Sequence, residues 1–304
     1  MRYGIVVSNM GVYSDPREVV RLARAAEDAD WDGFFVWDHL GFVWDTPSSD
    51  PWVILSAVAA CTERIRIGTD VTPLARRRPH IVANTLATLD ILSEGRVTFG
   101  AGLGGVPREF AAFGDTGDAK ERATMLDEGL AVLDRLMSGE EVTHHSEHYT
   151  VEGVTLAPLP VQRPRVPVWI GGEAKPALRR AARWDGWLAS ATPLDGSIRM
   201  SKSPERIAEM VSEIQRHQTS DTPFDVALDG YTEPGDATGP SAYEEAGATW
   251  WLESIHSRRG TVQEMLERVE AGPQTNNSQR NTSPGGESEP LFDPTSPSEK
   301  LGKA

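Results

Sequence analysis

An acidic residue and an imidazole stand side by side at the end of an apolar run in this 304-residue sequence. Residues 33–37, Gly-Phe-Phe-Val-Trp, have the composition of a buried strand, and Asp38 and His39 follow them directly. A histidine titrates near neutral pH, so it can pass a proton, and an adjacent carboxylate can tune it. Two residues are a short motif, and a turn-capping aspartate beside a satisfied histidine is the structural alternative.

Aromatic residues on both sides of this pair point to a ring-shaped ligand. Trp37 precedes the pair and Trp44 follows it at a distance of five residues from His39. Flat aromatic side chains suit the walls of a site for a ring cofactor. We therefore interpret Asp38 and His39 as facing a bound redox cofactor, with Trp44 among the residues that contact it.

A glycine-rich segment supplies a second group of candidates. Residues 100–105, Gly-Ala-Gly-Leu-Gly-Gly, follow an apolar run and formally match the dinucleotide-binding pattern. That pattern should open a helix in a first β-α-β unit, whereas here it lies mid-chain and Pro107 interrupts it. Small residues let a flat ligand approach the backbone, so Gly102, Gly104 and Gly105 are candidate cofactor contacts, with a plain glycine-rich loop as the alternative.

Five further residues are candidates for the same site. Glu109 follows the glycine-rich loop and is a candidate catalytic carboxylate, or else an exposed acid at a helix start. Gly171 and Gly172 precede a predicted helix, whose first backbone N–H groups can bind phosphate. Thr72 ends a predicted strand, and Arg76 opens an arginine run that either holds an anionic cofactor tail or lies on the surface.

Metal and nucleophile motifs carry less weight. His145 and His148, with His144 and Glu147 nearby, have a spacing that fits a helix, but the segment does not have a helical pattern and no cysteine joins it. We predict no metal site there. A metal-dependent hydrolase using Asp38, His39 and these histidines is kept as an alternative. Cys61 lies on an apolar helix and is interpreted as packing.

The elements that must position these residues alternate regularly along the chain. Asp15, Pro16 and Glu18 have the spacing of a capped helix start, and Gly95 ends another predicted helix. Strands are predicted at residues 3–7, 33–37, 65–72, 97–102, 166–171, 186–190, 224–229 and 249–253. Helices are predicted from residue 16 and at 51–61, 79–92, 119–137, 176–184, 204–217, 242–247 and 261–271.

Eight strands alternating with helices favour a closed (β/α)8 TIM barrel, with a doubly wound open sheet as the alternative. We expect one domain at residues 1–272, with an inserted hairpin and loop at about 140–165 that interrupts the alternation. From Pro273 the composition changes to Asn, Ser, Pro, Gly and Glu, and the segment 273–304 is predicted to be a disordered tail.

Composition excludes several classes of function. The net charge of −15 argues against a nucleic-acid binder, which normally has a basic face. No run of about 18 apolar residues occurs, so no membrane span is predicted. A single cysteine and the lack of a signal-peptide pattern lead us to expect a cytoplasmic protein.

Several motifs taken together resemble the bacterial luciferase-like superfamily of flavin- and deazaflavin-dependent oxidoreductases. The resemblance covers roughly residues 1–272. It is carried by residues 33–39, 74–79 with 88–90, 93–97, 99–105, 108–110, 137–140 and 168–172.

The resemblance implies a barrel that binds F420 or FMN at the mouth where the strands end. By the resemblance, His39 is a proton relay, Asp38 its partner and Glu109 an acid or positioning group. Trp44 fits the family loosely because the loop before it is about one residue longer, and the 140–165 insertion is short for the family. The implied activity is hydride transfer or monooxygenation of a small organic substrate, and we expect a homodimer. A non-catalytic subunit is the remaining alternative.

Overall fold

A computed structural model describes residues 1–190, 199–220, 222–232 and 238–274. Within these residues eight parallel strands close into a barrel, in the order β1-β2-β3-β5-β8-β9-β10-β11, and β11 pairs with β1. The strands are β1 (Arg2–Val7), β2 (Gly33–Val36), β3 (Arg66–Thr69), β5 (Val97–Gly102), β8 (Val168–Gly171), β9 (Gly186–Ser190), β10 (Asp225–Gly230) and β11 (Trp250–Ile255). The closed ring confirms the predicted TIM barrel.

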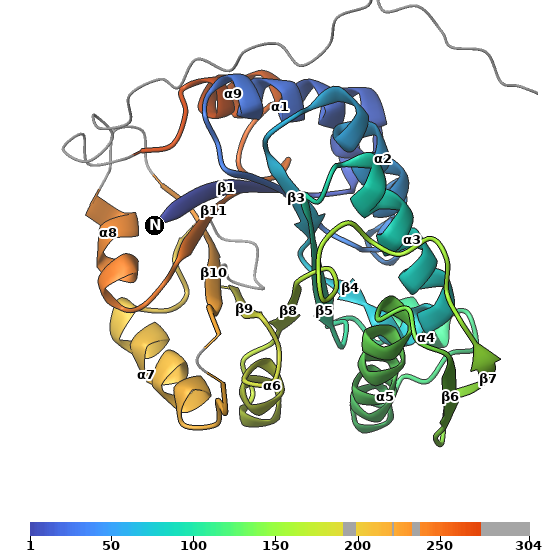
Figure 1. Cartoon of the computed structure of the whole chain (residues 1–304). Helices are drawn as coiled ribbons and strands as arrows, with labels where there is room; N and C mark the ends of the chain where they lie inside the picture. The colour runs from blue at the N-terminus through green and yellow to red at the C-terminus, as the bar shows by residue number, and fades with distance from the viewer. Residues whose placement is uncertain (191–198, 221, 233–237, 275–304) are drawn as a thin grey trace, which may run out of the picture. The chain divides into compact units, whose positions relative to one another are not determined.

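Helices surround the ring of strands on its outside (Figure 1). Their starts follow from local chemistry, because Asp15, Asp50 and Asp118 each accept a backbone N–H at a helix N-terminus. The helices are α1 (Pro16–Asp28), α2 (Pro51–Cys61), α3 (Pro79–Leu92), α4 (Arg108–Ala111), α5 (Ala119–Met137), α6 (Lys175–Ala181), α7 (Pro204–Gln215), α8 (Thr238–Glu245) and α9 (Val262–Glu270). In the described part of the chain, three short 3-10 helices accompany them, at Gly11–Ser14, Gly41–Trp44 and Leu74–Arg76.

Side chains from alternate strand positions fill the inside of the barrel. Phe35, Trp169 and Trp250 pack against one another, with ring centroids 5.3–6.0 Å apart, and all three are almost fully buried. Trp37 and Val71 are partly buried and lie against this cluster. The aromatic cluster closes the middle of the barrel, so any ligand must bind at the mouth beyond it.

The predicted strand at residues 65–72 is interrupted in the structure. β3 ends at Thr69, and a two-residue strand, β4 (Thr72–Pro73), then pairs with β5. Val71 lies between the two strands. A Cβ added to Gly102 would come within 2.5 Å of a Val71 methyl carbon, and one added to Gly171 within 2.8 Å of the other. The two glycines therefore make room for this break in the strand.

The insertion forms the predicted hairpin, with β6 (Val142–His145) antiparallel to β7 (Thr150–Val154). Other boundaries shift by a few residues, and the one-turn helix α4 was not predicted. No helix in the described part of the chain is long and apolar enough to cross a membrane. The predicted tail lies outside the described residues beyond Gln274.

Candidate functional site

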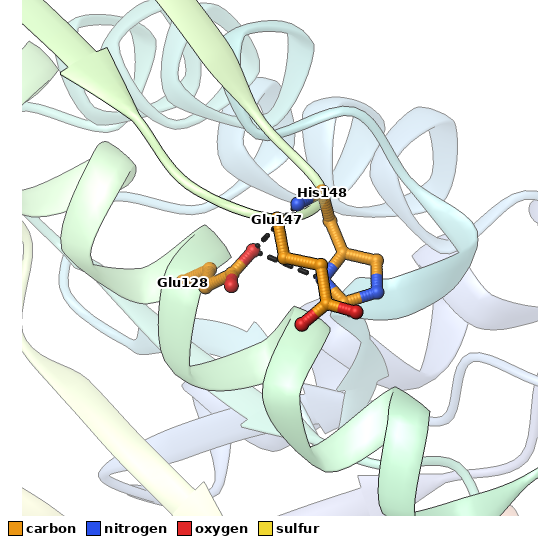
Figure 2. Close-up of side chains that lie close together, drawn as sticks. All are labelled: Glu128, Glu147 and His148. Carbon is orange, nitrogen blue, oxygen red and sulfur yellow. Dashed lines mark hydrogen bonds and ion pairs between the residues drawn. The ribbon is translucent and has the colours of Figure 1, made fainter.

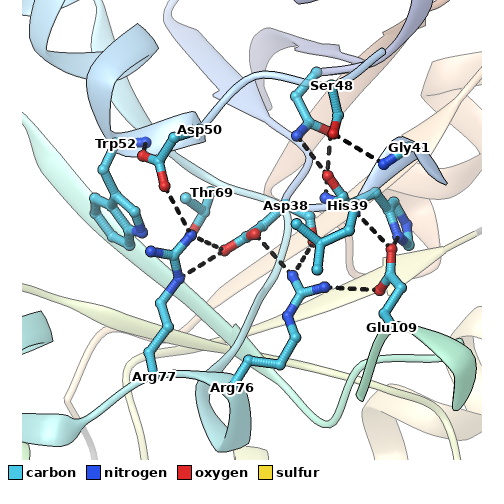
Figure 3. A network of polar contacts seen from close by, with 12 residues as sticks. Asp38, His39, Gly41, Ser48, Asp50, Trp52, Thr69, Arg76, Arg77 and Glu109 are labelled. Carbon is cyan, nitrogen blue, oxygen red and sulfur yellow. Dashed lines mark hydrogen bonds and ion pairs between the residues drawn. The ribbon is translucent and has the colours of Figure 1, made fainter. Parts of the chain in front are cut away.

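Three loops at the C-terminal ends of neighbouring strands bring the candidate residues together. Asp38 and His39 follow β2, Arg76 ends the 3-10 helix after β4, and Glu109 lies on α4 after β5. Figure 3 shows their side chains converging at the mouth of the barrel. The sequence prediction that Asp38, His39 and Glu109 lie together at this end therefore agrees with the geometry.

Glu109 holds the His39 ring in one orientation. Glu109 Oε1 lies 2.9 Å from His39 Nδ1 and accepts the Leu40 N–H at 2.7 Å. Glu109 is completely buried, whereas the His39 side chain is 30% exposed. A carboxylate can only accept hydrogen bonds, so Nδ1 carries the proton and Nε2 is the nitrogen left to exchange one.

The pKa of Glu109 supports this assignment. Burial acts to raise it, but the hydrogen bond and charge of His39, the Leu40 N–H and the charge of Arg76 together lower the pKa below its usual value. Glu109 is therefore ionised at neutral pH. A buried carboxylate next to His39 stabilises the imidazolium form whenever Nε2 takes up a proton.

Arg76 joins the two carboxylates of the site. Its Nη1 donates to Glu109 Oε2 at 2.9 Å, and its Nη2 donates to Asp38 Oδ1 at 2.8 Å and to the Asp38 carbonyl at 2.6 Å. The Arg76 side chain is almost fully buried and its guanidinium also lies over the Phe110 ring, 5.6 Å from the centroid. Both terminal nitrogens of Arg76 are thus committed to protein carboxylates, which differs from the predicted role in holding a cofactor tail.

Further contacts fix the backbone around His39. The Asn9 side-chain amide donates to the His39 carbonyl at 2.9 Å, and its oxygen accepts the His39 N–H at 3.2 Å. Arg77 lies between Asp38 and Asp50, 3.1 and 3.3 Å away (Figure 3). Because Asp50 also caps α2, the site is tied to the scaffold of the barrel.

The rings of Trp37 and Trp44, predicted as walls of a cofactor site, pack around His39. Trp44 meets the His39 ring edge-on with centroids 5.2 Å apart, and Trp37 does so at 6.0 Å. The other side of Trp37 faces His256, at 5.8 Å. His256 accepts or donates a hydrogen bond at Nε2 with the Tyr231 hydroxyl at 2.8 Å. Burial and the charges of Arg259 and Arg258 lower the His256 pKa to about 4, so this second imidazole is neutral.

The predicted glycine contacts have different surroundings. Gly102 and Gly171 face Val71, as described above. Gly104 has a left-handed φ of +78° and packs against Phe110, where a Cβ would approach the ring to 2.7 Å. Gly105 has open space around its Cα. The observed packing accounts for three of these glycines, and Gly105 remains a candidate contact on the open loop.

Two other candidates lie at the edge of the site. Thr72 is completely buried on β4, and its hydroxyl has no hydrogen-bond partner among the described residues. Gly172, with φ of +117°, precedes α6, and its carbonyl accepts the Trp187 indole N–H at 2.7 Å. The helix has only seven residues, so its contribution to phosphate binding by dipole alone is small.

The composition of the mouth fits a flat heteroaromatic cofactor. Val71 and Trp37 pack against the buried aromatic cluster and form an apolar surface at the mouth. His39 adds a polar group beside this surface, and Trp44 adds an aromatic ring. A ring system that is apolar on its faces and polar at its rim matches this arrangement. F420 and FMN both have such a ring, and Trp44, Val71 and His39 are the residues that would border it.

The histidines of the insertion are separated by the structure. His145 is exposed and faces Glu152. His148 faces α5 instead. There Glu128 Oε2 accepts the His148 backbone N–H at 3.0 Å and also lies 3.0 Å from His148 Nδ1. Figure 2 shows Glu128, Glu147 and His148, the one group of three in the described chain whose ligand atoms lie within 4.8 Å of each other. Glu128 is already occupied in holding the hairpin to α5, and the group lies outside the ring of strands.

Sequence reasoning missed three residues of the mouth. Asn9, Tyr231 and His256 each follow a predicted strand, and this position was the available signal. Their patterns contain no recognisable motif, and only the closure of the barrel brings His256 next to Trp37, with Tyr231 on His256.

Comparison with known proteins agrees with the fold and the resemblance. The family model described as luciferase-like monooxygenase matches residues 1–288. A relative from Microbacterium testaceum, named F420-dependent glucose-6-phosphate dehydrogenase, is 35% identical over 55% of this chain and 50% of its own length. The chain thus spans about half the length of the curated relatives it matches.

Solved structures share the barrel. An F420-dependent secondary alcohol dehydrogenase, in complex with an F420-acetone adduct, superposes with a TM-score of 0.73 at 18% identity, covering 88% of this chain and 97% of that one. The oxygenating constituent of 3,6-diketocamphane monooxygenase from Pseudomonas putida, in complex with FMN, gives 0.62 at 15% identity, covering 76% and 67%. These likenesses concern the fold. On the family match, the chain belongs to the luciferase-like monooxygenase family.

Proposed function

We propose that this protein is an F420- or FMN-dependent oxidoreductase that acts on a small organic substrate, with His39 as the residue that exchanges a proton. The observation that carries the proposal is the chain of contacts from Arg76 through Glu109 to His39 Nδ1, which leaves Nε2 of a partly exposed imidazole at the barrel mouth. The same arrangement of a base oriented by a buried carboxylate recurs in general acid–base catalysis.

Each residue has a defined part in the proposal. When bound, the cofactor supplies hydride transfer. For an alcohol or amine substrate, His39 Nε2 accepts the proton released as hydride leaves the substrate carbon, and in the reverse direction it returns that proton. Glu109 stabilises the imidazolium. Arg76 keeps Glu109 ionised, and Asp38 accepts a hydrogen bond that holds Arg76 in place. Trp44 and Trp37 restrict the His39 ring.

We favour F420 and hydride transfer over FMN and monooxygenation. The relatives at 33–36% identity are named as F420-dependent dehydrogenases, and a paired acid and histidine suits proton handling. The FMN-bound neighbour resembles this chain at 15% identity.

Titration of the purified full chain with F420 and, separately, with FMN tests the proposal, with cofactor fluorescence as the readout. Saturable binding of F420 with weaker binding of FMN supports it. Tighter binding of FMN would move the proposal to the monooxygenase branch, and failure to bind either cofactor would favour a non-catalytic subunit.

The metal-dependent hydrolase has less support. Asp38 and Glu109 are both paired with arginine, so neither offers a carboxylate to a metal at the mouth. Stoichiometric zinc in purified protein that is required for hydrolysis would reverse this preference.

We also propose a homodimer in the cytoplasm. Val53 at the start of α2 and Ile81 at the start of α3 are exposed by 65% and 57%, on helices that pack against each other. Exposed apolar side chains are typical of interfaces. Light scattering on the full chain tests the dimer, and the Val53→Glu, Ile81→Glu double variant should shift it to monomer.

A further inference from the structure

The two loops that carry His39 and Glu109 also present aromatic side chains to solvent. Among the residues that the structure describes, Phe42, Trp44 and Phe113 are the most exposed large aromatic side chains, at 39%, 40% and 67%. Phe42 and Trp44 belong to the 3-10 helix after β2, and Phe113 follows α4 after β5. The most exposed rings of the described chain therefore gather at the barrel mouth, on the same loops as the candidate proton-exchanging residue.

Contacts between these rings join the two loops. Phe42 and Phe113 lie edge to face, with ring centroids 5.5 Å apart and planes at 86°. The Arg108 guanidinium lies over the Phe42 ring, 5.8 Å from its centroid. Trp44, two residues after Phe42, meets the His39 ring at 5.2 Å. We call Phe42, Trp44 and Phe113 the aromatic rim, and it extends from His39 to the loop after β5.

The turn that presents the aromatic rim is held by the site itself. Glu109 Oε1 accepts the Leu40 N–H at 2.7 Å, directly before the 3-10 helix begins. The Gly41 N–H donates to the Ser48 hydroxyl at 2.9 Å. The same carboxylate therefore orients His39 and fixes the start of the turn. A surface that is already ordered binds a ligand at a lower entropic cost than one that must first become ordered.

The chemistry of the aromatic rim matches an apolar group. Exposed apolar patches mark binding sites in soluble proteins, and ring edges and faces pack well against other rings. Near His39, the guanidinium groups of Arg76 and Arg77 are already paired with carboxylates of the site. Arg108 contacts Phe42, so an anionic ligand is the alternative that the experiment has to separate.

We propose that Phe42, Trp44 and Phe113 bind the apolar group of the substrate while its reacting carbon lies at His39. The role as a substrate site rests on the proposed function, whereas the binding of an apolar group does not. The substrate class is then an alcohol with an aromatic or other bulky apolar substituent, or the corresponding carbonyl compound. The aromatic rim sets specificity, and proton exchange stays with His39.

Isothermal titration of the full chain with 1-phenylethanol, 2-propanol and glucose 6-phosphate tests the proposal. The first two are secondary alcohols that differ by a phenyl group in place of a methyl group. We expect 1-phenylethanol to bind at least about tenfold more tightly than the other two, with or without F420 present. Equal affinities for the two alcohols would overturn the proposal. Tighter binding of glucose 6-phosphate that is lost in Arg108→Ala would assign the surface to an anion instead.

Matched variants locate the effect. Phe113→Ala should weaken the binding of 1-phenylethanol by about fivefold and leave that of 2-propanol unchanged, because an edge-to-face ring contact is lost. Phe113→Tyr keeps the ring and should keep the preference. Leu92→Ala removes an apolar side chain that is 48% exposed at the end of α3, just before β5 starts at the opposite end of the barrel, and should change neither affinity. An unchanged preference in the Phe42→Ala, Phe113→Ala double variant would contradict the proposal.

Failure of this proposal and failure of the proposed function give different results. If the phenyl preference is present but neither F420 nor FMN binds, the apolar site stands and the redox function fails. If a cofactor binds and the double variant keeps the preference, the redox function stands and the aromatic rim has no part in specificity. Light scattering covers the remaining occupant, a second copy of the chain. A dimer that dissociates in Phe113→Ala, with unchanged affinity for 1-phenylethanol, would make the aromatic rim a subunit contact.

Discussion

The mouth of the barrel contains two carboxylate regions with opposite surroundings. On one side, Asp38 and Glu109 are each bonded to Arg76, and Asp38 also to Arg77. On the other side, Asp70 follows β3, and the negative charge of Asp229 acts on its carboxyl group. Burial acts to raise the pKa in both regions, but His39 and Arg76 lower that of Glu109, while Asp229 raises that of Asp70 further.

Burial alone therefore does not decide whether a carboxyl group is ionised, since the Glu109 pKa is lowered and the Asp70 pKa is raised. Partners decide it, since an arginine at hydrogen-bond distance favours the carboxylate and a second acid favours the protonated form. The paired region can orient a base and keep it ready to accept a proton.

Removal of Arg76 should have the largest effect on stability. Arg76→Met leaves Glu109 buried without its ion pair, and we expect a loss of about 3–5 kcal/mol in the free energy of unfolding by urea. Arg77→Met is the matched control, because Arg77 is 27% exposed, and it should cost about 1 kcal/mol or less. Equal losses would show that Arg76 is not the main counter-charge of the site.

Removal of the base should have the next largest effect, on turnover. His39→Ala should reduce turnover of the cofactor-loaded enzyme by about 10²-fold or more, while cofactor affinity changes by less than about tenfold. Steady-state rates and fluorescence titration measure the two quantities. His217→Ala, at an exposed histidine after α7, should change neither. Unchanged turnover in His39→Ala would remove His39 from the mechanism.

Substitution of Asp70 should change stability in the opposite direction. Asp70→Asn keeps the shape of the side chain and removes a carboxyl group whose charged form is disfavoured by burial and by the charge of Asp229, so we expect the protein to become more stable by about 1–3 kcal/mol at pH 8. Urea unfolding measures the change. Destabilisation by a similar amount would mean that Asp70 is already paired in the folded protein.

The two regions should also differ in pH dependence. The Asp70 pKa is raised in the folded state, so the advantage of Asp70→Asn is complete above about pH 8, shrinks as the pH falls, and disappears below 3.8, where Asp70 is protonated in both states. The Glu109 pKa is lowered, so its stabilising contribution is complete above 4.5 and is lost as the pH falls through the lower folded value. Unfolding of Asp70→Asn and Glu109→Gln between pH 4 and 9 measures both, and parallel curves would contradict the comparison.

The smallest effect is expected at the exposed edge of the paired region. Asp50 is 46% exposed in its contact with Arg77, and asparagine also caps helices. Asp50→Asn should change the free energy of unfolding by about 0.5 kcal/mol or less. A loss of several kcal/mol would show that the network extends to α2 as one unit.

Much of the fold could be predicted because its signals are local. The helix bounds 51–61, 79–92 and 119–137 and the strand bounds 97–102 and 186–190 agree with the structure. Proline at the first helical turn and aspartate before it set several of these starts. The break after Thr69 was missed because it depends on space left by Gly102 and Gly171, which are distant in the sequence.

In the candidate site too, some features follow from local sequence and others depend on residues that are distant in the sequence. A position after a strand was enough to place Asp38, His39 and Glu109 at one end of the barrel. Arg76 lies in the site as predicted, but its partners are protein carboxylates, and its neighbour Arg78 is exposed. Asp70 was not singled out, because an acid after a strand has no distinctive pattern until its neighbours are known.

The order of apolar runs and turns by itself determined eight strands, their direction and the end at which their following residues gather. Only the tertiary structure decided which acid binds an arginine and which acid is exposed to the charge of another acid. The reason is that hydrophobic periodicity is read from adjacent residues, whereas the charge of a buried group depends on side chains brought from other loops to within a few ångströms.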